Sequence, residues 1–304
     1  MALVTSDFLA ALFTNYQVIF KQALGDLALT IDDYKKISTM FTSTSDKETY
    51  NWLGDVPSME EWKDQRQLRG LRPFNYTLTN KHYESTVEID RNTIEDDKYN
   101  LITPRIRGLA RSALKHFNEI LFSLLDDGES TACYDGGYFF ADTRVIGASA
   151  NIDNIIDGNY SDSATEIRAG IKAAVERMRR FQNDWGKVMN LTPDTIVCAP
   201  EMEVAIKDAL LPGVAGTRRP EQDYVKSFIV QPWIDADTDD WFALCTTEEV
   251  KPMIFQLRKS PEFIAMDDPK SSHVFKNKTF LYGVDDRFEV GYGDPRTAIL
   301  MHNT

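Results

Sequence analysis

The sequence predicts an α+β protein, and three observations support this fold class. Two long stretches, 101–126 and 164–189, carry apolar residues at three- and four-residue spacing, which predicts amphipathic helices. Shorter runs with period-two alternation or continuous apolar character predict strands before and after these helices. The order is hairpin, helix, loop, helix and then several strands, whereas a nucleotide-binding sheet would alternate strand and helix regularly.

The composition is that of an acidic globular chain. Its 304 residues are 42% hydrophobic and 27% charged, and the net charge is −13. This length suffices for one large domain or two modest ones, and the negative charge disfavours general attraction to nucleic acid. The three cysteines are far apart without CxxC spacing, which favours reduced, buried thiols. No apolar run approaches the roughly 20 residues that would span a bilayer.

Residues 1–38 are predicted to be helical, with an interruption between Asp26 and Asp33. Two interpretations are open: an ordinary first helix packed on the core, or an arm laid across a neighbouring molecule. Residues 39–48 are rich in Ser and Thr and predict a connector.

The stretch 49–100 predicts an extended hairpin with little apolar sequence to bury. Apolar and polar residues alternate over 74–78 and again over 83–89, and the segment 63–72 reads KDQRQLRGLR. A long hairpin is not stable alone in water, so we expect it to lie on a second copy of the protein. Asn80-Lys81 is either a tight hairpin turn or an irregularity in the returning strand. We favour the second, with the tip at 62–73, because 47–61 then has a partner strand.

The helix at 101–126 is predicted to end at Asp126-Asp127-Gly128. A loop-rich stretch, 129–160, follows, and it is either mobile or ordered by contact with something else. After the second helix come a buried strand at 195–200, a short helix at 201–210 and a loop at 212–220. The remaining runs predict short separate strands at 228–234, 241–246, 253–258, 263–266, 274–284 and 288–293.

The sequence offers little catalytic or metal-binding chemistry. The four histidines are scattered without ligand spacing, and no phosphate-binding loop or nucleophile elbow occurs. The acidic run 235–240 lacks the glycine and terminal glutamate of a calcium loop, so we interpret it as a solvated turn rather than a cation site or a hydrolase site. Glu95-Asp96-Asp97 is interpreted as a helix N-terminus. We therefore expect no catalytic residue, metal or cofactor.

The hairpin is the candidate contact site. Its cations could bind phosphate, but in so acidic a chain we expect them to meet carboxylates of another subunit. Its two tryptophans are either core residues or apolar anchors of an interface. The predicted inter-subunit contact residues are Trp52, Trp62, Lys63, Arg66, Arg69, Arg72 and Phe74.

Five ordered segments resemble the major head subunit of Mu-like tailed phages, the gpT family. The matching segments are Tyr50 to Gly54 with Pro57 and Glu61-Trp62; Tyr83 to Val87 with Glu95 to Asp97; Asp127-Gly128 and Cys133 to Gly136 with Phe139-Phe140; Lys251 to Gln256 with Arg258-Lys259 and Glu262-Phe263; and Leu281 to Val284 with Asp286-Arg287 and Val290 to Gly293. One departure follows Phe139-Phe140, where the family tends to have an acidic residue and His-Pro, and this chain has Ala141 to Arg144.

The resemblance implies the tailed-phage major capsid fold of the Hong Kong 97 type. It implies an N-terminal arm (1–46), an extended loop or E-loop with its base strands (47–98), a peripheral domain (99–160) with a spine helix at 101–126, an axial domain (161–250), and return strands that complete the peripheral domain (251–304).

The implied function is a major capsid protein that self-assembles into hexamers and pentamers around double-stranded DNA, without sequence-specific DNA binding. The implied partners are further copies of the chain, a separate scaffolding protein, a portal and a decoration protein. The implied location is the virion, assembled in the bacterial host cytoplasm. The alternative is another phage structural subunit, such as a tail-tube protein.

Overall fold

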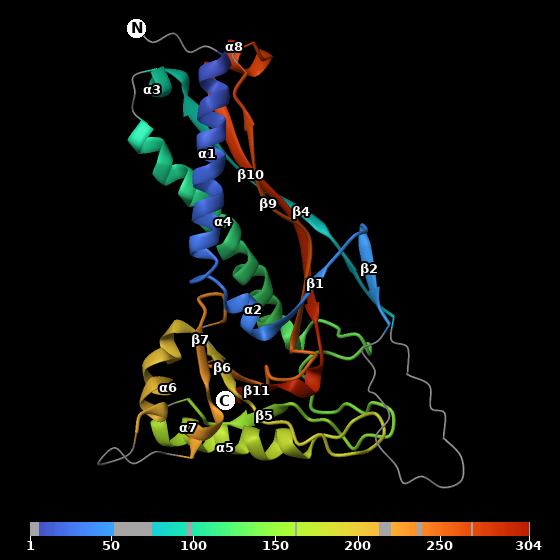
Figure 1. Ribbon diagram of the computed structural model, residues 1–304. Coiled ribbons are helices and arrows are strands. Elements are labelled where there is room, and N and C mark those ends of the chain that lie inside the picture. The colour runs from blue at the N-terminus through green and yellow to red at the C-terminus, as the bar shows by residue number, and fades with distance from the viewer. Residues whose placement is uncertain are drawn as a thin grey trace.

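Two sheets organise the protein, which a computed structural model describes over residues 6–51, 75–95, 99–161, 163–212, 220–235, 239–268 and 270–303. A four-stranded sheet extends along an upright part of the molecule, and a five-stranded sheet lies in a broader base (Figure 1). The chain's described N-terminal end is near the top of the upright part, and its C-terminal end is in the base. The fold is α+β, as predicted.

The first sheet has the strand order β1-β9-β10-β4. Its strands are β1 (Ser38–Thr42), β9 (Met253–Met266), β10 (Thr279–Tyr292) and β4 (Lys81–Asp90). β1 is parallel to β9, whereas β10 is antiparallel to both β9 and β4. Separate short strands were predicted for 253–258 and 263–266, and for 274–284 and 288–293. The structure corrects this, because each pair belongs to one 14-residue strand.

Residues 272–277, included in a predicted strand, instead form the short helix α8 (Ser272–Asn277). The reason is local: the Ser271 hydroxyl accepts a hydrogen bond from the Val274 amide and caps the helix. Lys278 then adopts a left-handed conformation, with φ of 57°, that ends the helix before β10 begins.

One face of the first sheet is covered by the helices α1 (Ser6–Leu27) and α4 (Tyr99–Asp126), which run side by side in Figure 1. α4 confirms the predicted long helix and measures about 42 Å at ~1.5 Å per residue. α1 packs on its own chain: the Tyr16 ring meets Tyr282 edge-on, with centroids 5.4 Å apart, and Phe20 contacts Phe263. Of the two interpretations for residues 1–38, the structure supports the packed first helix for this segment. α2 (Asp33–Ile37) follows after the interruption.

The second sheet has the strand order β5-β11-β8-β6-β7. Its strands are β5 (Ile155–Gly158), β11 (Ala298–Asn303), β8 (Trp241–Leu244), β6 (Thr195–Cys198) and β7 (Ser227–Val230). Alternate residues of one strand enter different cores. Phe242 and Leu244 join the central core with α4, whereas Trp241 and Ala243 join the core beneath α5 (Ala164–Arg180). This sheet is therefore buried on both faces. The strands β6, β7 and β8 were predicted from the sequence, whereas β5 and β11 were not.

The second long helix ends earlier than predicted, at Arg180 rather than near Met189. Phe181 leaves the helical conformation, with ψ of 142°, and a turn follows. The Asn183 side chain accepts hydrogen bonds from the amides of Trp185 and Lys187, and Gly186 has a positive φ of 73°. This local hydrogen bonding competes with continuation of the helix.

The remaining elements are short. They are α3 (Arg91–Glu95), the 3-10 turn η1 (Asp127–Glu129), η2 (Pro200–Met202), α6 (Glu203–Leu210), α7 (Glu221–Tyr224) and η4 (Pro295–Thr297). The predicted end of α4 at Asp126 and the predicted helix after β6 are both confirmed.

Candidate assembly surface

A two-stranded ribbon forms the base of the predicted extended loop. It consists of β2 (Lys47–Tyr50) and β3 (Tyr76–Thr79), which pair antiparallel and belong to neither large sheet. β3 pairs with β2, and the following strand β4 pairs with β10, so Asn80-Lys81 is not a hairpin turn. Of the predicted partner segment 47–61, residues 47–50 are confirmed as the strand that pairs with β3, and residues 52–61 lie outside the described residues.

Four polar residues hold the root of this ribbon to the body, and we call Ser43, Tyr50, Asn80 and Gln256 the root network. The Gln256 side chain accepts a hydrogen bond from the Tyr50 hydroxyl at 2.7 Å and donates one to the Asn80 Oδ1 at 2.8 Å. The Asn80 amide in turn donates to the Ser43 hydroxyl at 2.9 Å. All four residues are buried. Buried polar groups that are fully paired stabilise one specific arrangement, so this network fixes the position of the ribbon root.

Two further contacts seat the ribbon root. The Tyr76 hydroxyl accepts a hydrogen bond from the Tyr292 amide at 3.1 Å, which joins β3 to the end of β10. The Glu48 carboxylate accepts hydrogen bonds from the Thr44 amide at 3.0 Å and the Ser43 hydroxyl at 2.9 Å, and these bonds lower its pKa. None of these residues was predicted from the sequence to hold the ribbon root, although Asn80 and Gln256 are polar residues flanked by strand-forming ones, which was a usable signal.

The predicted contact residues themselves lie beyond this root. Trp52, Trp62, Lys63, Arg66, Arg69, Arg72 and Phe74 are outside the described residues. Their role between subunits therefore stays a prediction.

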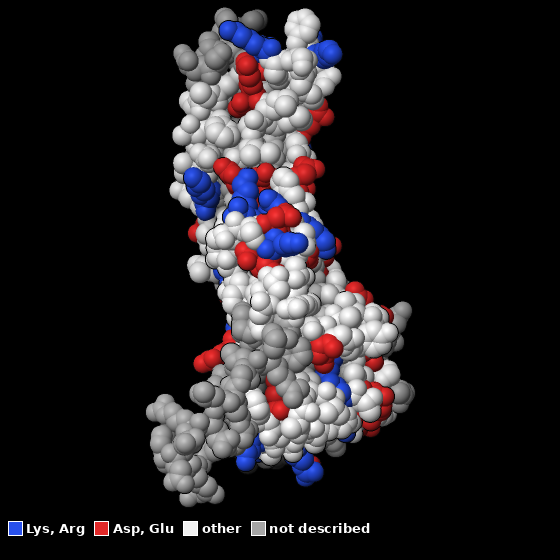
Figure 2. Space-filling view, turned by 90° about the vertical axis from the view of Figure 1, so that its right-hand side faces the viewer, with Lys and Arg blue, Asp and Glu red and all other residues white. Residues whose placement is uncertain are grey.

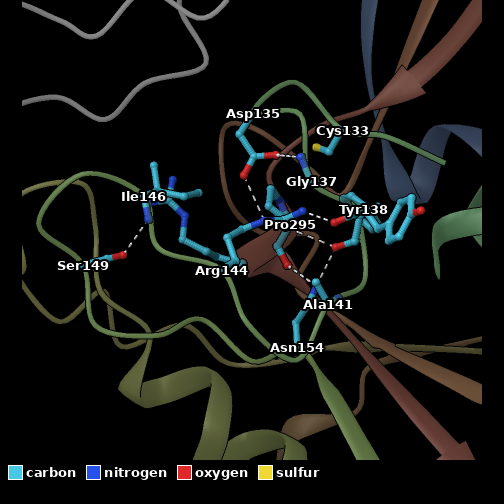
Figure 3. Close-up of polar contacts among 12 residues, drawn as sticks. Cys133, Asp135, Gly137, Tyr138, Ala141, Arg144, Ile146, Ser149, Asn154 and Pro295 are labelled. Atoms are coloured by element: carbon cyan, nitrogen blue, oxygen red, sulfur yellow. Dashed lines mark hydrogen bonds and ion pairs between the residues drawn. The ribbon is translucent and has the colours of Figure 1, made fainter. Parts of the chain in front are cut away.

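The long loop after α4 is ordered by contacts with its own chain. Arg144 is buried and forms an ion pair with Asp135, with 2.9 Å between Nε and Oδ2. Its guanidinium also donates to the carbonyls of Tyr138 and Phe139 (Figure 3). Arg144 stands in the stretch where the sequence departs from the family pattern, so this chain uses its own residue to organise the loop.

Asn154 joins this loop to the turn between β10 and β11, and Arg296 is anchored within that turn. The Asn154 amide donates to the carbonyls of Phe139 and Pro295, at 2.9 and 3.1 Å, and its Oδ1 accepts from the Ala141 amide (Figure 3). Arg296 is buried between β10 and β11 and pairs with Asp294 through two nitrogens, at 2.8 and 2.7 Å. The Asn154 hydrogen bonds therefore hold the loop against the turn that joins the two sheets.

The open face of the first sheet carries intermixed charges. Lys259 pairs with Asp285 at 2.8 Å, and His82 meets the same carboxylate at 3.1 Å. Arg287 pairs with Asp46 at 3.0 Å across the gap to the ribbon root. Acidic and basic side chains also lie together at mid-height of the upright part in Figure 2. Such exposed pairs contribute little to folding stability, and their arrangement can discriminate between partners.

The acidic run at 235–240 is not simply a solvated turn. Asp240 is buried and accepts a hydrogen bond from the Asn303 amide at 2.7 Å, while burial raises its pKa to about 6. The expectation was therefore wrong for Asp240, because the start of β8 carries it under the end of β11. Asp237 lies outside the described residues.

Metal and thiol chemistry has no evident site in the described part of the chain. There, no three His, Cys, Asp or Glu side chains are grouped to hold a metal ion. Cys133, Cys198 and Cys245 are free and buried, as predicted, and burial raises the pKa of the Cys198 thiol to about 12. Among the described helices, none is both long and apolar enough to cross a membrane.

The architecture is shared with solved proteins of a phage procapsid and of a virus-like particle. A procapsid protein of bacteriophage JBD30 matches with a TM-score of 0.61 at 25% identity, covering 99% of this chain and 77% of that one. A virus-like particle protein from Pyrococcus furiosus matches with a TM-score of 0.58 at 11% identity, covering 94% and 99%. The protein therefore has the fold of tailed-phage capsid subunits.

Sequence comparison narrows this class to one family. Residues 9–166 and 221–304 match the family described as Mu-like prophage major head subunit gpT. The chain is 30% identical over 293 residues to the Mu-like prophage FluMu major head subunit of Haemophilus influenzae, covering 96% of this chain and 72% of that one. It is 26% identical over 306 residues to the major capsid protein of Escherichia phage Mu, covering 98% and 75%. The chain belongs to the Mu-like gpT major head subunit family, and these relatives are structural proteins rather than enzymes.

Proposed function

We propose that the chain self-assembles, as hexamers and pentamers, into the icosahedral head shell that encloses double-stranded DNA. The observation that carries this proposal is the ribbon root. The root network fixes two short strands that leave the body, and this is the arrangement a subunit needs to reach a neighbour from a defined position. Family membership supports the same conclusion.

The proposed domains follow the two sheets. The N-terminal arm is residues 1–46, and the extended loop with its base is 47–98. The peripheral domain comprises 99–160 and 251–304 and includes α4 as its spine helix, while the axial domain is 161–250. We propose two adjustments to these bounds: β5 and β11 are assigned to the axial domain rather than to the peripheral domain. The reason is that β11 pairs with both β5 and β8 in the five-stranded sheet.

The proposed contact residues are those of the extended loop. Aromatic and arginine side chains dominate the energetics of interfaces, and Trp52, Trp62 and Phe74 provide the apolar anchors. Lys63, Arg66, Arg69 and Arg72 provide charges that select the partner surface.

Further partners are proposed from the same function. The proposed partners are a scaffolding protein, a portal at one vertex and a decoration protein on the outer surface of the shell. One solved capsid of bacteriophage JBD30 is decorated with minor capsid protein trimers, which supports the last of these. The net charge of −13 fits a shell that does not adhere to the DNA it encloses, and we propose no sequence-specific DNA binding. We place assembly in the cytoplasm of the bacterial host.

The test is negative-stain electron microscopy with light scattering on the purified full chain, alone and co-expressed with a candidate scaffolding protein. Closed shells, or rings of five or six subunits, are the expected products. Open tubes would instead support a tail-tube subunit, and a chain that remains monomeric with every scaffold would contradict the proposal. A second test addresses the contact residues. The triple charge reversal Arg66→Glu, Arg69→Glu, Arg72→Glu is expected to leave a folded monomer that assembles poorly.

A further inference from the structure

A groove of about 480 Å³ lies between α4 and the first sheet, away from the ribbon root. Its walls come from β4, α4 and β10, with Trp233 completing the lining. β4 is an edge strand of the sheet, paired with β10 on one side and with no described strand on the other. An edge strand beside a groove is a suitable surface for an extended segment of another chain.

Asp286 is the unusual residue of this groove. It lies on the α4-facing side of β10, between Val284 and Phe288, and only 4% of its surface is exposed. Its Oδ1 has no hydrogen-bond donor among the described residues. Burial, with a smaller contribution from the nearby Asp285 charge, raises the pKa of Asp286 to about 7. A buried carboxylate without a partner is costly in the isolated subunit, and a positive charge brought into the groove would remove that cost.

The rim of the groove adds to its negative charge. Glu84 on β4 and Glu119 on α4 are exposed and line the groove. Lys115 also lines it, and His116 lies 3.3 Å from the Glu119 carboxylate with its ring against Tyr83. Three carboxylates against one lysine favour a cationic occupant. The predicted extended loop carries such a cationic run at 63–72, with Lys63 and three arginines against one aspartate. The run of equal net charge at 171–180 belongs to helix α5.

We infer that this groove receives the cationic segment 63–72 of a second copy of the chain, with Asp286 as the buried partner of one of its cations. The inference rests on the proposed function and specifies the surface on which the extended loop docks. An arginine suits this position best, because its guanidinium offers several donors to a carboxylate and is more weakly hydrated than an ammonium group. Such a pair sets the register between subunits more than the total affinity.

The first test replaces the carboxylate without changing its shape. Asp286→Asn is expected to leave the subunit folded and at least as heat-stable, yet to raise the concentration needed for assembly about tenfold. The matched control is Asp285→Asn, the next residue on the opposite face of β10, which loses pairs with Lys259 and His82 inside one subunit. This control is expected to assemble as wild type. Assembly is measured at several salt concentrations. If Asp286→Asn and wild type need the same protein concentration to assemble at each of them, the inference is overturned.

The second test locates the occupant and does not depend on the Asp286 variant folding. Ser112→Cys places a thiol in the groove wall on an exposed position, and Gln67→Cys places one in the cationic segment. Shells assembled from a mixture of the two single variants are treated with a short bis-maleimide, which forms a thioether with each thiol. We expect a cross-linked dimer from this mixture. A mixture with Ser130→Cys, which is exposed but outside the groove, serves as the control and is expected to give none.

The outcomes separate this inference from the proposed function. If wild-type chains form shells and the Ser112–Gln67 mixture gives no dimer, the groove holds something else and only the inference fails. If wild-type chains form no shells with any scaffold, the proposed function itself fails. A cross-link that appears in shells and is absent from unassembled subunits supports both.

Discussion

The two sheets of this protein are covered differently, and the difference shows where a partner can bind. The five-stranded sheet sends alternate residues into two cores, so strands such as β8 are buried on both faces. The four-stranded sheet packs one face against α1 and α4. The ribbon root covers its other face only near Gln256 and Gly291, and further along that face Lys259, Asp285 and Arg287 form partly exposed pairs. The first arrangement uses its surface for folding, whereas the second leaves a face and the β4 edge available.

The sharpest test of this comparison is one truncation in each sheet. Trp241→Ala in β8 removes a fully buried ring whose Nε1 donates to the Tyr160 carbonyl, and we expect a loss of about 3–5 kcal/mol in unfolding free energy. Ile264→Ala on the open face of β9, where 43% of the side chain is exposed, is expected to cost less than about 1 kcal/mol. Urea unfolding of unassembled subunits measures both, and similar losses would show that the open face is packed after all.

The next prediction concerns the ribbon root. Gln256→Ala leaves the Tyr50 hydroxyl and the Asn80 carbonyl oxygen without their partner, and we expect about 1–3 kcal/mol of destabilisation. Because the ribbon position is also released, shell yield should fall more than the lost stability explains. Gln182→Ala is the control, since that half-buried side chain accepts a single hydrogen bond among the described residues, from the exposed Ala150 amide. A shell yield that simply follows stability in both variants would argue against a positioning role.

The pH dependence of stability should reveal the buried carboxylate. The folded-state pKa of Asp286 is raised to about 7 from 3.8, so between these values the folded subunit retains a proton that the unfolded chain has lost. Raising the pH through this window therefore destabilises the folded subunit, by up to about 1.4 kcal/mol for each unit of pKa shift. The charged and titratable groups around Asp286 are Tyr83, Glu84, Lys115, His116 and Glu119 in the groove, and Asp285, His82 and Lys259 on the opposite face of the sheet.

Comparing unfolding at pH 5 and pH 8 for wild type and Asp286→Asn isolates this one group. The wild-type subunit should lose more stability than the variant between the two pH values, because the asparagine carries no charge at either. Parallel pH profiles would mean that the carboxyl is not buried in solution as it is in the structure.

The smallest expected effect compares two helical glycines. Gly25 of α1 is exposed and a Cβ there would meet nothing within 4 Å, so Gly25→Ala should stabilise the subunit by about 0.5–1 kcal/mol. Gly170 of α5 lies against the second sheet, where a Cβ would sit 2.9 Å from Trp241 Cζ2. Gly170→Ala should therefore destabilise, as thermal unfolding can show. Stabilisation by both substitutions would contradict the tight packing of the second sheet.

Much of the fold was predictable because it follows local pattern. The apolar spacing of α4, the alternation in β3 and β4, and the apolar run of β6 each identify an element within a few residues. The sequence did not distinguish two 14-residue strands from four short ones, because β9 changes from fully buried at Met253 to alternating beyond Gln256 as it passes from one core to the next.

The proposed assembly surface was predictable only in part. The cationic segment and the tryptophans stand out in the sequence, whereas Asp286 is one of 47 acidic residues in the chain. What sets Asp286 apart is its side of β10, which depends on the register of that strand against β4 and β9. Likewise, Arg144 and Arg296 become structural only through the carboxylates that the fold brings to them.

By itself, the sequence determined the α+β class, the long helix, the strands of the ribbon and the family. These depend on spacing and on short motifs, which act over a few residues of chain. The tertiary structure alone decided that β11 completes the five-stranded sheet, that the root network is closed by Gln256, and that Asp286 is buried beside α4. Each of these depends on residues distant in sequence, and burial and hydrogen bonding arise only when folding brings such residues together.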